Sequence, residues 1–260
     1  MVRTRARIRF RKQGDLRLIG HRDLVRLLER LFRRAGVRLA MSQGFHPKPR
    51  MSFPSALALG IEGLDEVMEV ELAEAPGEAS GAPPPSDACL ASAETLRSQL
   101  AQHSVPGLTF ATVEILPAGA KKALLRSSTY QLPLPDDRRA AAAEQVAALG
   151  LARPETTSES VPDSEGGAQA ASEAVREQAA LVRRSLDAIG IEGGILWFRL
   201  RSTRERSAGP RDVLAVLGLD DVERRGVCLT RAEVQLEPSE PASVRQTPVA
   251  ADASSPTLPG

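Results

Sequence analysis

The stretch Val2-Arg-Thr-Arg-Ala-Arg-Ile-Arg-Phe-Arg11 decides the architecture, because its side chains alternate strictly in character. Every second residue from Val2 to Phe10 is uncharged, and the five residues that complete the alternation are arginines. A period of two is typical of a strand with one face in a hydrophobic core. The other face would be entirely arginine, and like charges along one strand repel each other. Such a face needs acidic neighbours or an anionic partner to screen it.

The elements that follow this strand are interpreted as the order β-α-β-β-α-β, in which both helices and three of the four strands are assigned to residues. Residues 21–35 have the apolar stripe of an amphipathic helix, residues 67–72 and 109–116 read as strands, and a helix is expected over 86–103. A similar series recurs later in the chain: a strand at 128–134, a helix at 136–149, a strand at 195–201, a helix at 210–217 and a strand at 227–236. The predicted fold class is α+β, with two tandem ferredoxin-like domains.

Composition places the boundaries of these domains. The first is expected over residues 1–120 and a second, smaller α+β domain over residues 126–237. Residues 153–170 are rich in Pro, Ser, Glu and Gly and are predicted to be a disordered insertion, and residues 238–260 a disordered tail.

Charge is distributed unevenly along the chain. Residues 1–50 carry fifteen Lys or Arg against three acidic residues, a net charge of +12, so the other 210 residues sum to −11 in a chain of net charge +1. This asymmetry favours a basic surface for nucleic acid or another polyanion, although an acidic second half docked onto that surface would explain it too.

The segment from Ser42 to Phe53, Ser-Gln-Gly-Phe-His-Pro-Lys-Pro-Arg-Met-Ser-Phe, has the composition of a binding loop. Each proline fixes its own φ and drives the preceding residue toward extended geometry, so the segment can present side chains without first ordering them. Gly44 is expected to supply the bend.

Three segments carry a resemblance to a known family: Ile8-Arg-Phe10, Leu16-Arg-Leu-Ile-Gly-His-Arg-Asp-Leu24, and Ser42 to Phe53 running on to Gly60. They resemble the radical-SAM-associated family, long described as a domain of unknown function. The resemblance covers most of residues 3–236 and is most specific in residues 8–72. Many members have serine where this chain has Gly20, and Asn-Pro-His-Pro where this chain has His46-Pro-Lys48-Pro.

The resemblance implies a partner, since members of that family lie next to, or are fused to, a radical SAM protein with a cobalamin-type domain. That partner would carry the iron-sulfur cluster, S-adenosylmethionine and, where present, cobalamin. This chain lacks the Cys-x-x-x-Cys-x-x-Cys motif, and its two cysteines cannot supply three thiolate ligands. We therefore expect no cofactor in this chain and no catalytic subunit role.

The expected function is that of an accessory protein that binds RNA or another anionic substrate and presents it to the radical SAM partner. Cations would contact phosphates, while Phe45 and His46 would stack on a base. The predicted binding residues are Arg3, Arg5, Arg7, His21, Gly44, Phe45, His46, Lys48 and Arg50. A second basic patch, Arg201, Arg204, Arg206 and Arg211, could extend the groove, and a solvated loop explains it equally well.

Two alternatives stay open. One is a metal-independent RNA-processing endonuclease, in which His21 is the general acid or base and Lys48 or Arg50 stabilises developing charge. The other is an adaptor that only docks proteins, through Phe45, Met51 and Phe53. No residues have metal-ligand spacing, no apolar run is long enough to span a bilayer, and the cytoplasm is the expected compartment.

Overall fold

The computed structural model describes residues 4–73, 86–149, 169–203 and 206–238. The first half of the chain contains β1 (Arg5–Lys12), the short 3-10 helix η1 (Gly14–Leu18), α1 (His21–Arg34), β2 (Met51–Ser52), β3 (Glu62–Glu71), α2 (Ser86–Gln102) and β4 (Leu108–Leu116). The second half contains β5 (Leu125–Pro133), α3 (Asp136–Ala148), α4 (Gln169–Ser185), β6 (Leu186–Glu192), β7 (Ile195–Arg201), α5 (Pro210–Val216) and β8 (Thr230–Leu236).

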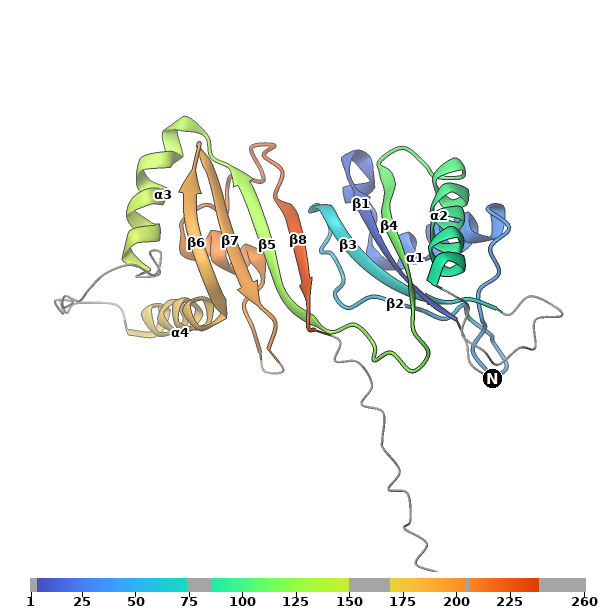
Figure 1. Cartoon of the computed structure of the whole chain (residues 1–260). Coiled ribbons are helices and arrows are strands. Elements are labelled where there is room, and N and C mark those ends of the chain that lie inside the picture. The colour runs from blue at the N-terminus through green and yellow to red at the C-terminus, as the bar shows by residue number, and fades with distance from the viewer. Residues whose placement is uncertain (1–3, 74–85, 150–168, 204–205, 239–260) are drawn as a thin grey trace, which may run out of the picture.

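The strands form one mixed sheet of eight strands that runs through both halves, and with the helices they make a mixed α/β fold (Figure 1). The order is β4-β1-β3-β8-β5-β7-β6, and the short β2 pairs with the end of β3. Neighbouring strands are antiparallel except for β3 and β8, which run parallel where Glu62 faces Thr230 and Gly63 faces Arg231. Strand β8, the last strand that the structure describes, therefore lies in the middle of the sheet.

Strand β1 forms as its alternation predicts. Ala6, Ile8 and Phe10 are almost completely buried and pack in a core with Leu28 and Leu31 of α1. The arginines of β1 lie on the other face of the sheet, because successive side chains of a strand point to opposite sides. Helices α1 and α5 lie behind the strands in the view of Figure 1, so that view looks onto the arginine-bearing face.

The second core joins the two halves. It is built around Leu132 of β5 and Phe198 of β7, and it also takes in Leu57 and Ile61 from the segment before β3. Residues in the range 1–120 and residues in the range 126–237 thus share a sheet, and a segment of the first range packs in the core formed mainly by the second.

Most predicted elements lie where the sequence placed them, with two omissions. Helix α4 and strand β6 had no predicted counterpart, and β3 begins at Glu62, five residues before the predicted strand at 67–72. Residues 169–170 of the predicted disordered insertion open α4, while 153–168 lie outside the described residues. The predicted tail lies outside them too, apart from residue 238.

Candidate functional site

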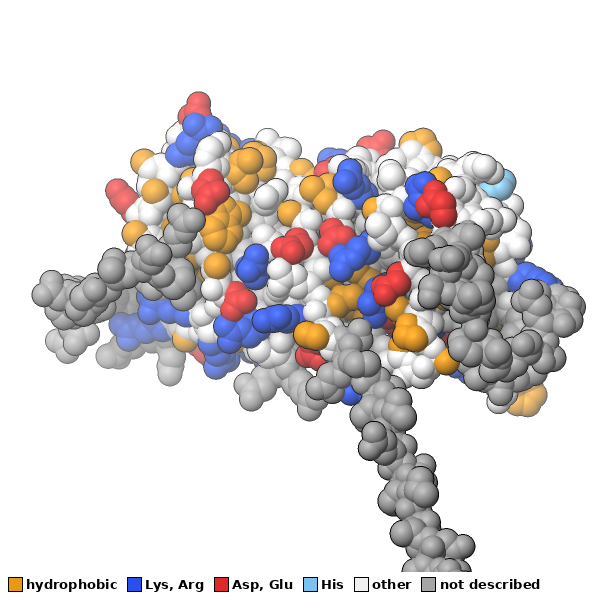
Figure 2. All heavy atoms as spheres, viewed as in Figure 1, with side chains coloured by type: hydrophobic (Ala, Val, Ile, Leu, Met, Phe, Trp, Pro, Cys, Tyr) orange, Lys and Arg blue, Asp and Glu red, His pale blue; other side chains and the backbone are white. Residues whose placement is uncertain are grey.

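The arginines of β1 are paired with carboxylates of the neighbouring strands. Arg7 Nη2 lies 3.0 Å from Glu69 Oε1, and Arg7 Nη1 lies 3.5 Å from Glu114 Oε2. Arg9 forms an ion pair with Asp65. The screening that the sequence requires therefore comes from β3 and β4, within the first half of the chain. Acidic and basic side chains alternate over this face in Figure 2.

The second half continues the same pattern. Arg199 Nη2 lies 3.8 Å from Glu233 Oε2, and Arg201 pairs with Asp187. Arg211 Nε donates to Glu223 Oε2 at 2.7 Å, and this hydrogen bond raises the pKa of Arg211 above its usual value. Of the second predicted basic patch, Arg204 lies outside the described residues, Arg206 is exposed, and the other two members are engaged in ion pairs.

Residues 40–50, called the arm below, form a hairpin-like projection between α1 and β2. The Arg50 backbone N donates to Ala40 O and the Ser42 N to Lys48 O, each at 2.8 Å. The Ser42 hydroxyl accepts from the Lys48 N at 3.0 Å, and the Ala40 N donates to Glu71 O of β3 at 2.8 Å. The base of the arm is therefore fixed to the sheet before any ligand binds.

The tip of the arm turns at Gly44, whose φ of 130° lies in the range that favours glycine. Phe45 follows it and is completely exposed, at 102%. His46 and Lys48 are exposed as well, and Arg50 is half-buried, with its Nη1 3.5 Å from Glu71 Oε2. The arm thus presents an aromatic ring and a lysine to solvent on an ordered base.

His21 and Phe53 contact each other beside the foot of the arm. Their ring centroids are 4.9 Å apart and the rings are nearly perpendicular, at 87°. Phe53 and Met51 are partly buried against the first core. Met51 and Phe53 are therefore less exposed than Phe45. Packing against Phe53 accounts for the position of His21.

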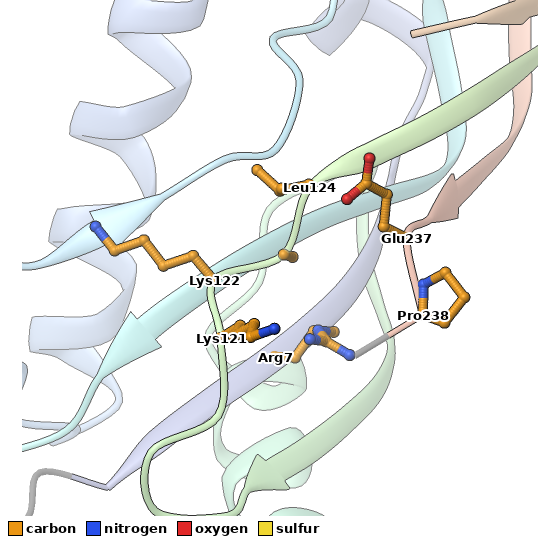
Figure 3. Close-up of a pocket in the computed structure, with 7 residues that line it drawn as sticks. Arg7, Lys121, Lys122, Leu124, Glu237 and Pro238 are labelled. Carbon is orange, nitrogen blue, oxygen red and sulfur yellow. The ribbon is translucent and has the colours of Figure 1, made fainter. Parts of the chain in front are cut away.

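Two hollows open on the arginine-bearing face near the connection 117–124. The larger, of about 420 Å³, is lined by Arg7, Lys121, Lys122, Ala123, Leu124, Glu237 and Pro238 (Figure 3). The smaller, of about 140 Å³, is lined by Arg5, Arg50, Met51, Ser52, Glu69, Val70, Glu71 and Lys122. Lys122 belongs to both, so the hollows adjoin at this residue, and Arg50 links the smaller one to the base of the arm.

Arg5 holds the connection in place across the sheet. Its Nη2 donates to the carbonyl of Ala120 and, at 3.1 Å, to that of Lys121. On the other side, the Glu237 N donates to Leu124 O at 2.9 Å. These hydrogen bonds fix the backbone on either side of Lys122, so the position of this side chain is set by both halves of the protein.

The sequence interpretation missed Lys121, Lys122 and Glu237, because the two lysines fall between the expected domains 1–120 and 126–237 and Glu237 is the last residue of the second. A compositional signal was present. The chain has thirty arginines and four lysines, and three of the lysines are the exposed Lys48, Lys121 and Lys122. The fourth, Lys12, is buried, with its Nζ donating to Ile19 O at 2.9 Å.

The structure brings most of the predicted binding residues into one region, but not into one pocket. Arg5 and Arg50 share the smaller hollow and Arg7 lines the larger one, while Phe45, His46 and Lys48 stand on the arm. Arg3 lies outside the described residues. Among the residues that the structure describes, no three His, Cys, Asp or Glu side chains are grouped as metal ligands would be.

A buried charge cluster joins the halves behind this region. Arg231 Nε of β8 donates to Glu66 Oε1 of β3 at 2.8 Å, and Arg231 Nη1 donates to Ser55 Oγ at 3.0 Å. Burial lowers the pKa of Arg231, but the hydrogen bonds and charge of Glu66 outweigh it and leave that pKa raised. Burial also lowers the pKa of Lys12, against the opposing effect of Glu66. This cluster is a structural joint between β3 and β8.

Residues 5–165 match the model of a family described as an uncharacterized protein conserved in bacteria (DUF2344). The chain belongs to this family. The match covers the arm, the connection 117–124 and all the cations that line the two hollows, and it ends before α4. A search of curated proteins found no match. No helix within the described ranges has the length and apolar character needed to cross a membrane.

Proposed function

We propose that this protein is a non-catalytic accessory of a radical SAM enzyme and that it binds RNA, or another anionic substrate, with its arm and the hollows beside it. The observation that carries the proposal is the exposed ring of Phe45 on an ordered arm whose base adjoins cation-lined hollows. Sequence-tolerant RNA binding combines these two features, because bases stack on aromatic rings and phosphates bind cations.

In this proposal the arginines of β1 mainly stabilise the sheet and the connection 117–124, whereas the sequence analysis expected them to bind phosphates. Arg7 and Arg9 are engaged by carboxylates, so their charges are largely balanced on the sheet. Arg5 positions the connection through its hydrogen bonds to carbonyls. Lys48 on the arm and Lys122 of the connection are both exposed, and in this proposal they contact phosphates.

We infer that each half has the ferredoxin-like topology. The first half has the element order β-α-β-β-α-β and the strand order β4-β1-β3-β2. The second half, with α3 and α4 between its first two strands, has the strand order β8-β5-β7-β6, which is the same arrangement. Such a unit leaves one face of its sheet open, as the arginine-bearing face is here.

The radical SAM partner rests on the sequence resemblance rather than on the geometry. The cluster, S-adenosylmethionine and any cobalamin would belong to that partner, and the cytoplasm is the compartment that suits the complex. In this proposal the chain holds and orients the substrate, and the partner carries out the chemistry.

Binding to total cellular RNA across a salt series tests the RNA part. We expect salt-sensitive binding that weakens in the Lys48→Ala, Arg50→Ala double variant, because phosphate contacts release counterions. Phe45→Ala should cost about 1–3 kcal/mol, the usual contribution of stacking on one base, whereas Phe45→Trp should bind like the wild type. No binding by the wild type at low salt would refute the RNA part.

A protein-docking adaptor is the second candidate, and the exposure of Phe45 together with Met41, which is 45% exposed, favours it. An apolar contact of this kind should persist as salt rises. Co-purification with the radical SAM protein, retained at high salt and lost in Phe45→Ala, would support this candidate. Retention by Phe45→Ala would place the docking surface elsewhere on the protein.

A further inference from the structure

The outward face of α1 carries a row of arginines, called the α1 row below. Arg22, Arg26, Arg30 and Arg33 are all exposed, and their spacings of four, four and three residues place them on one side of the helix. The row extends about 17 Å along the helix axis. The apolar stripe of α1 packs in the first core, so the row faces away from the sheet, on the side opposite the arginine-bearing face (Figure 1).

Most of the α1 row is not balanced by carboxylates, in contrast to the arginines of β1. Arg26 Nη1 lies 3.4 Å from Asp23 Oδ1, and these side chains are 72% and 63% exposed. Among the residues that the structure describes, Arg22, Arg30 and Arg33 take part in no ion pair or side-chain hydrogen bond. Three of the four guanidinium groups are therefore available to an anion from outside.

The neighbouring acidic side chains do not remove this surplus. Glu29 is the other acidic residue of α1, and it is half-buried and forms no ion pair with a described residue. The helix contains five arginines and two acidic residues, a net charge of +3. On α2, Glu94 is already engaged by Arg97, and on η1 the charge of Asp15 is matched by that of Arg17.

The α1 row works against the stability of the helix that carries it. Arg22, Arg26 and Arg30 follow one another at intervals of four residues, and like charges at this spacing repel. Arg22 also lies in the first turn, where the helix dipole disfavours a cation, whereas Arg33 in the last turn is favoured by it. Packing and capping thus give no reason for Arg22 and Arg30, and a bound anion would supply one.

The composition of this face indicates what kind of anion it suits. None of the exposed large apolar side chains that the structure describes lies on α1, whereas a protein interface has an apolar centre. The apolar stripe of α1 is buried in the first core, so it is not free to enter a bilayer as the apolar face of a membrane-surface helix does. Guanidinium groups match phosphate geometry bidentately. An extended phosphodiester backbone therefore fits the row best.

We infer that α1 binds the phosphodiester backbone of RNA along its outward face, and that it contacts phosphates and not bases. The inference rests on the proposed function and deepens it, because it adds a second RNA-binding surface on the helix layer. Arg38 joins this surface to the arm. It is exposed, and its carbonyl oxygen accepts from the Ala73 N at 3.0 Å, which fixes the backbone between α1 and the arm. RNA held by the arm can thus continue along α1.

The test is fluorescence anisotropy with a labelled RNA duplex and a labelled oligouridylate of equal length, each over a salt series. The α1 variant is Arg22→Gln, Arg30→Gln. The matched control is Arg176→Gln, Arg184→Gln in α4, because these two arginines are also exposed, have the same spacing and form no ion pair with a described residue. Glutamine is about as good a helix former as arginine, so both variants should fold, and thermal midpoints check this first.

We expect the α1 variant to bind both probes about 4- to 25-fold more weakly, from about two- to fivefold for each exposed ionic contact. The slope of log affinity against log salt should become shallower by about 1.8 for the duplex, with the coefficient of duplex DNA, and by about 1.4 for the single strand. The α4 variant should change neither quantity. Phe45→Ala should weaken binding of the oligouridylate alone, because the bases of a duplex are not free to stack on a side chain.

The outcomes separate this inference from the proposed function. If the α1 variant binds both probes like the wild type while Lys48→Ala, Arg50→Ala binds more weakly, the inference is overturned and RNA binding through the arm stands. If the wild type binds no RNA at low salt, both are overturned, and binding to phosphatidylglycerol vesicles would then assign the α1 row to a lipid surface. Equal loss in the α4 variant would show that general charge governs the affinity, and this too overturns the inference.

Discussion

The buried joint between β3 and β8 predicts an unusual order of stabilities. The side chains of Arg231 and Glu66 are only 2% and 5% exposed, and Arg231 holds both Glu66 and Ser55. Lys12 is buried in the same cluster, where Glu66 favours its charged form and Arg231 opposes it. Glu66 is thus one anion for two buried cations, and removing it should be worse than removing either cation.

The magnitudes follow from what each variant leaves behind. Breaking a buried pair costs about 3–5 kcal/mol, because an uncompensated charge remains. Glu66→Leu should lie at the upper end, about 5 kcal/mol, since Arg231 and Lys12 are then left together. Arg231→Leu should cost about 3 kcal/mol, because Lys12 can still neutralise Glu66. The double variant should be less destabilised than either single variant, since removing both partners leaves neither Arg231 nor Glu66 as an uncompensated buried charge.

Guanidinium denaturation of the four proteins measures these differences. An unchanged denaturant slope would show that the same surface is exposed on unfolding in each protein. The midpoint of thermal unfolding of Glu66→Leu should fall by roughly 10–20 °C, from about 2–4 °C per kcal/mol in a chain of this size. If Glu66→Leu does not fold, Glu66→Gln takes its place with the same expected order. A larger loss for Arg231→Leu than for Glu66→Leu, or additive losses in the double variant, would refute the reasoning.

Three further predictions concern other positions. Gly107→Ala should lower the free energy of unfolding by about 1–3 kcal/mol, because its φ is 82° and an added Cβ would lie 2.3 Å from the Gln13 carbonyl oxygen; chemical denaturation checks this, and no loss would contradict it. The folded protein binds the Lys12 proton less tightly than the unfolded chain does, so this residue should make stability rise as pH rises toward and through 10.5; subtracting the curve of Lys12→Met should isolate the rise, and a flat difference would oppose it. Wild type and His21→Ala should both leave RNA intact in gel assays, since the ring packs on Phe53, and cleavage lost only in the variant would favour the endonuclease alternative.

Local periodicity was sufficient to predict the elements with one buried face. The alternation of β1 and the apolar stripe of α1 both correspond to buried residues in the first core. Helix α4 and strand β6 had no prediction, although Leu181, Val182 and Ile189 from them are buried in the second core. These elements follow a stretch of biased composition, where no boundary signal separates helix from insertion. Their apolar residues can be recognised as core residues only once the core around Phe198, in which they are buried, is known.

The candidate site divides in the same way. The arm could be predicted because its prolines, glycine and aromatic ring are contiguous in sequence. The hollows could not, since they combine β1, the connection and the end of β8. The sequence also could not show whether carboxylates would pair with the arginine face. Glu69 and Glu114 reach Arg7 only because of the register of three strands.

The central place of β8 in the sheet has a consequence for synthesis. Its partner β3 ends at Glu71, while β8 begins at Thr230. At about 5–20 residues per second, roughly 8–30 s of translation separate the two strands. Until β8 is made, the start of β3 lacks its parallel neighbour, and β5, once made, has one edge unpaired. Such unpaired strand edges favour pairing between nascent chains until β8 takes its place in the sheet.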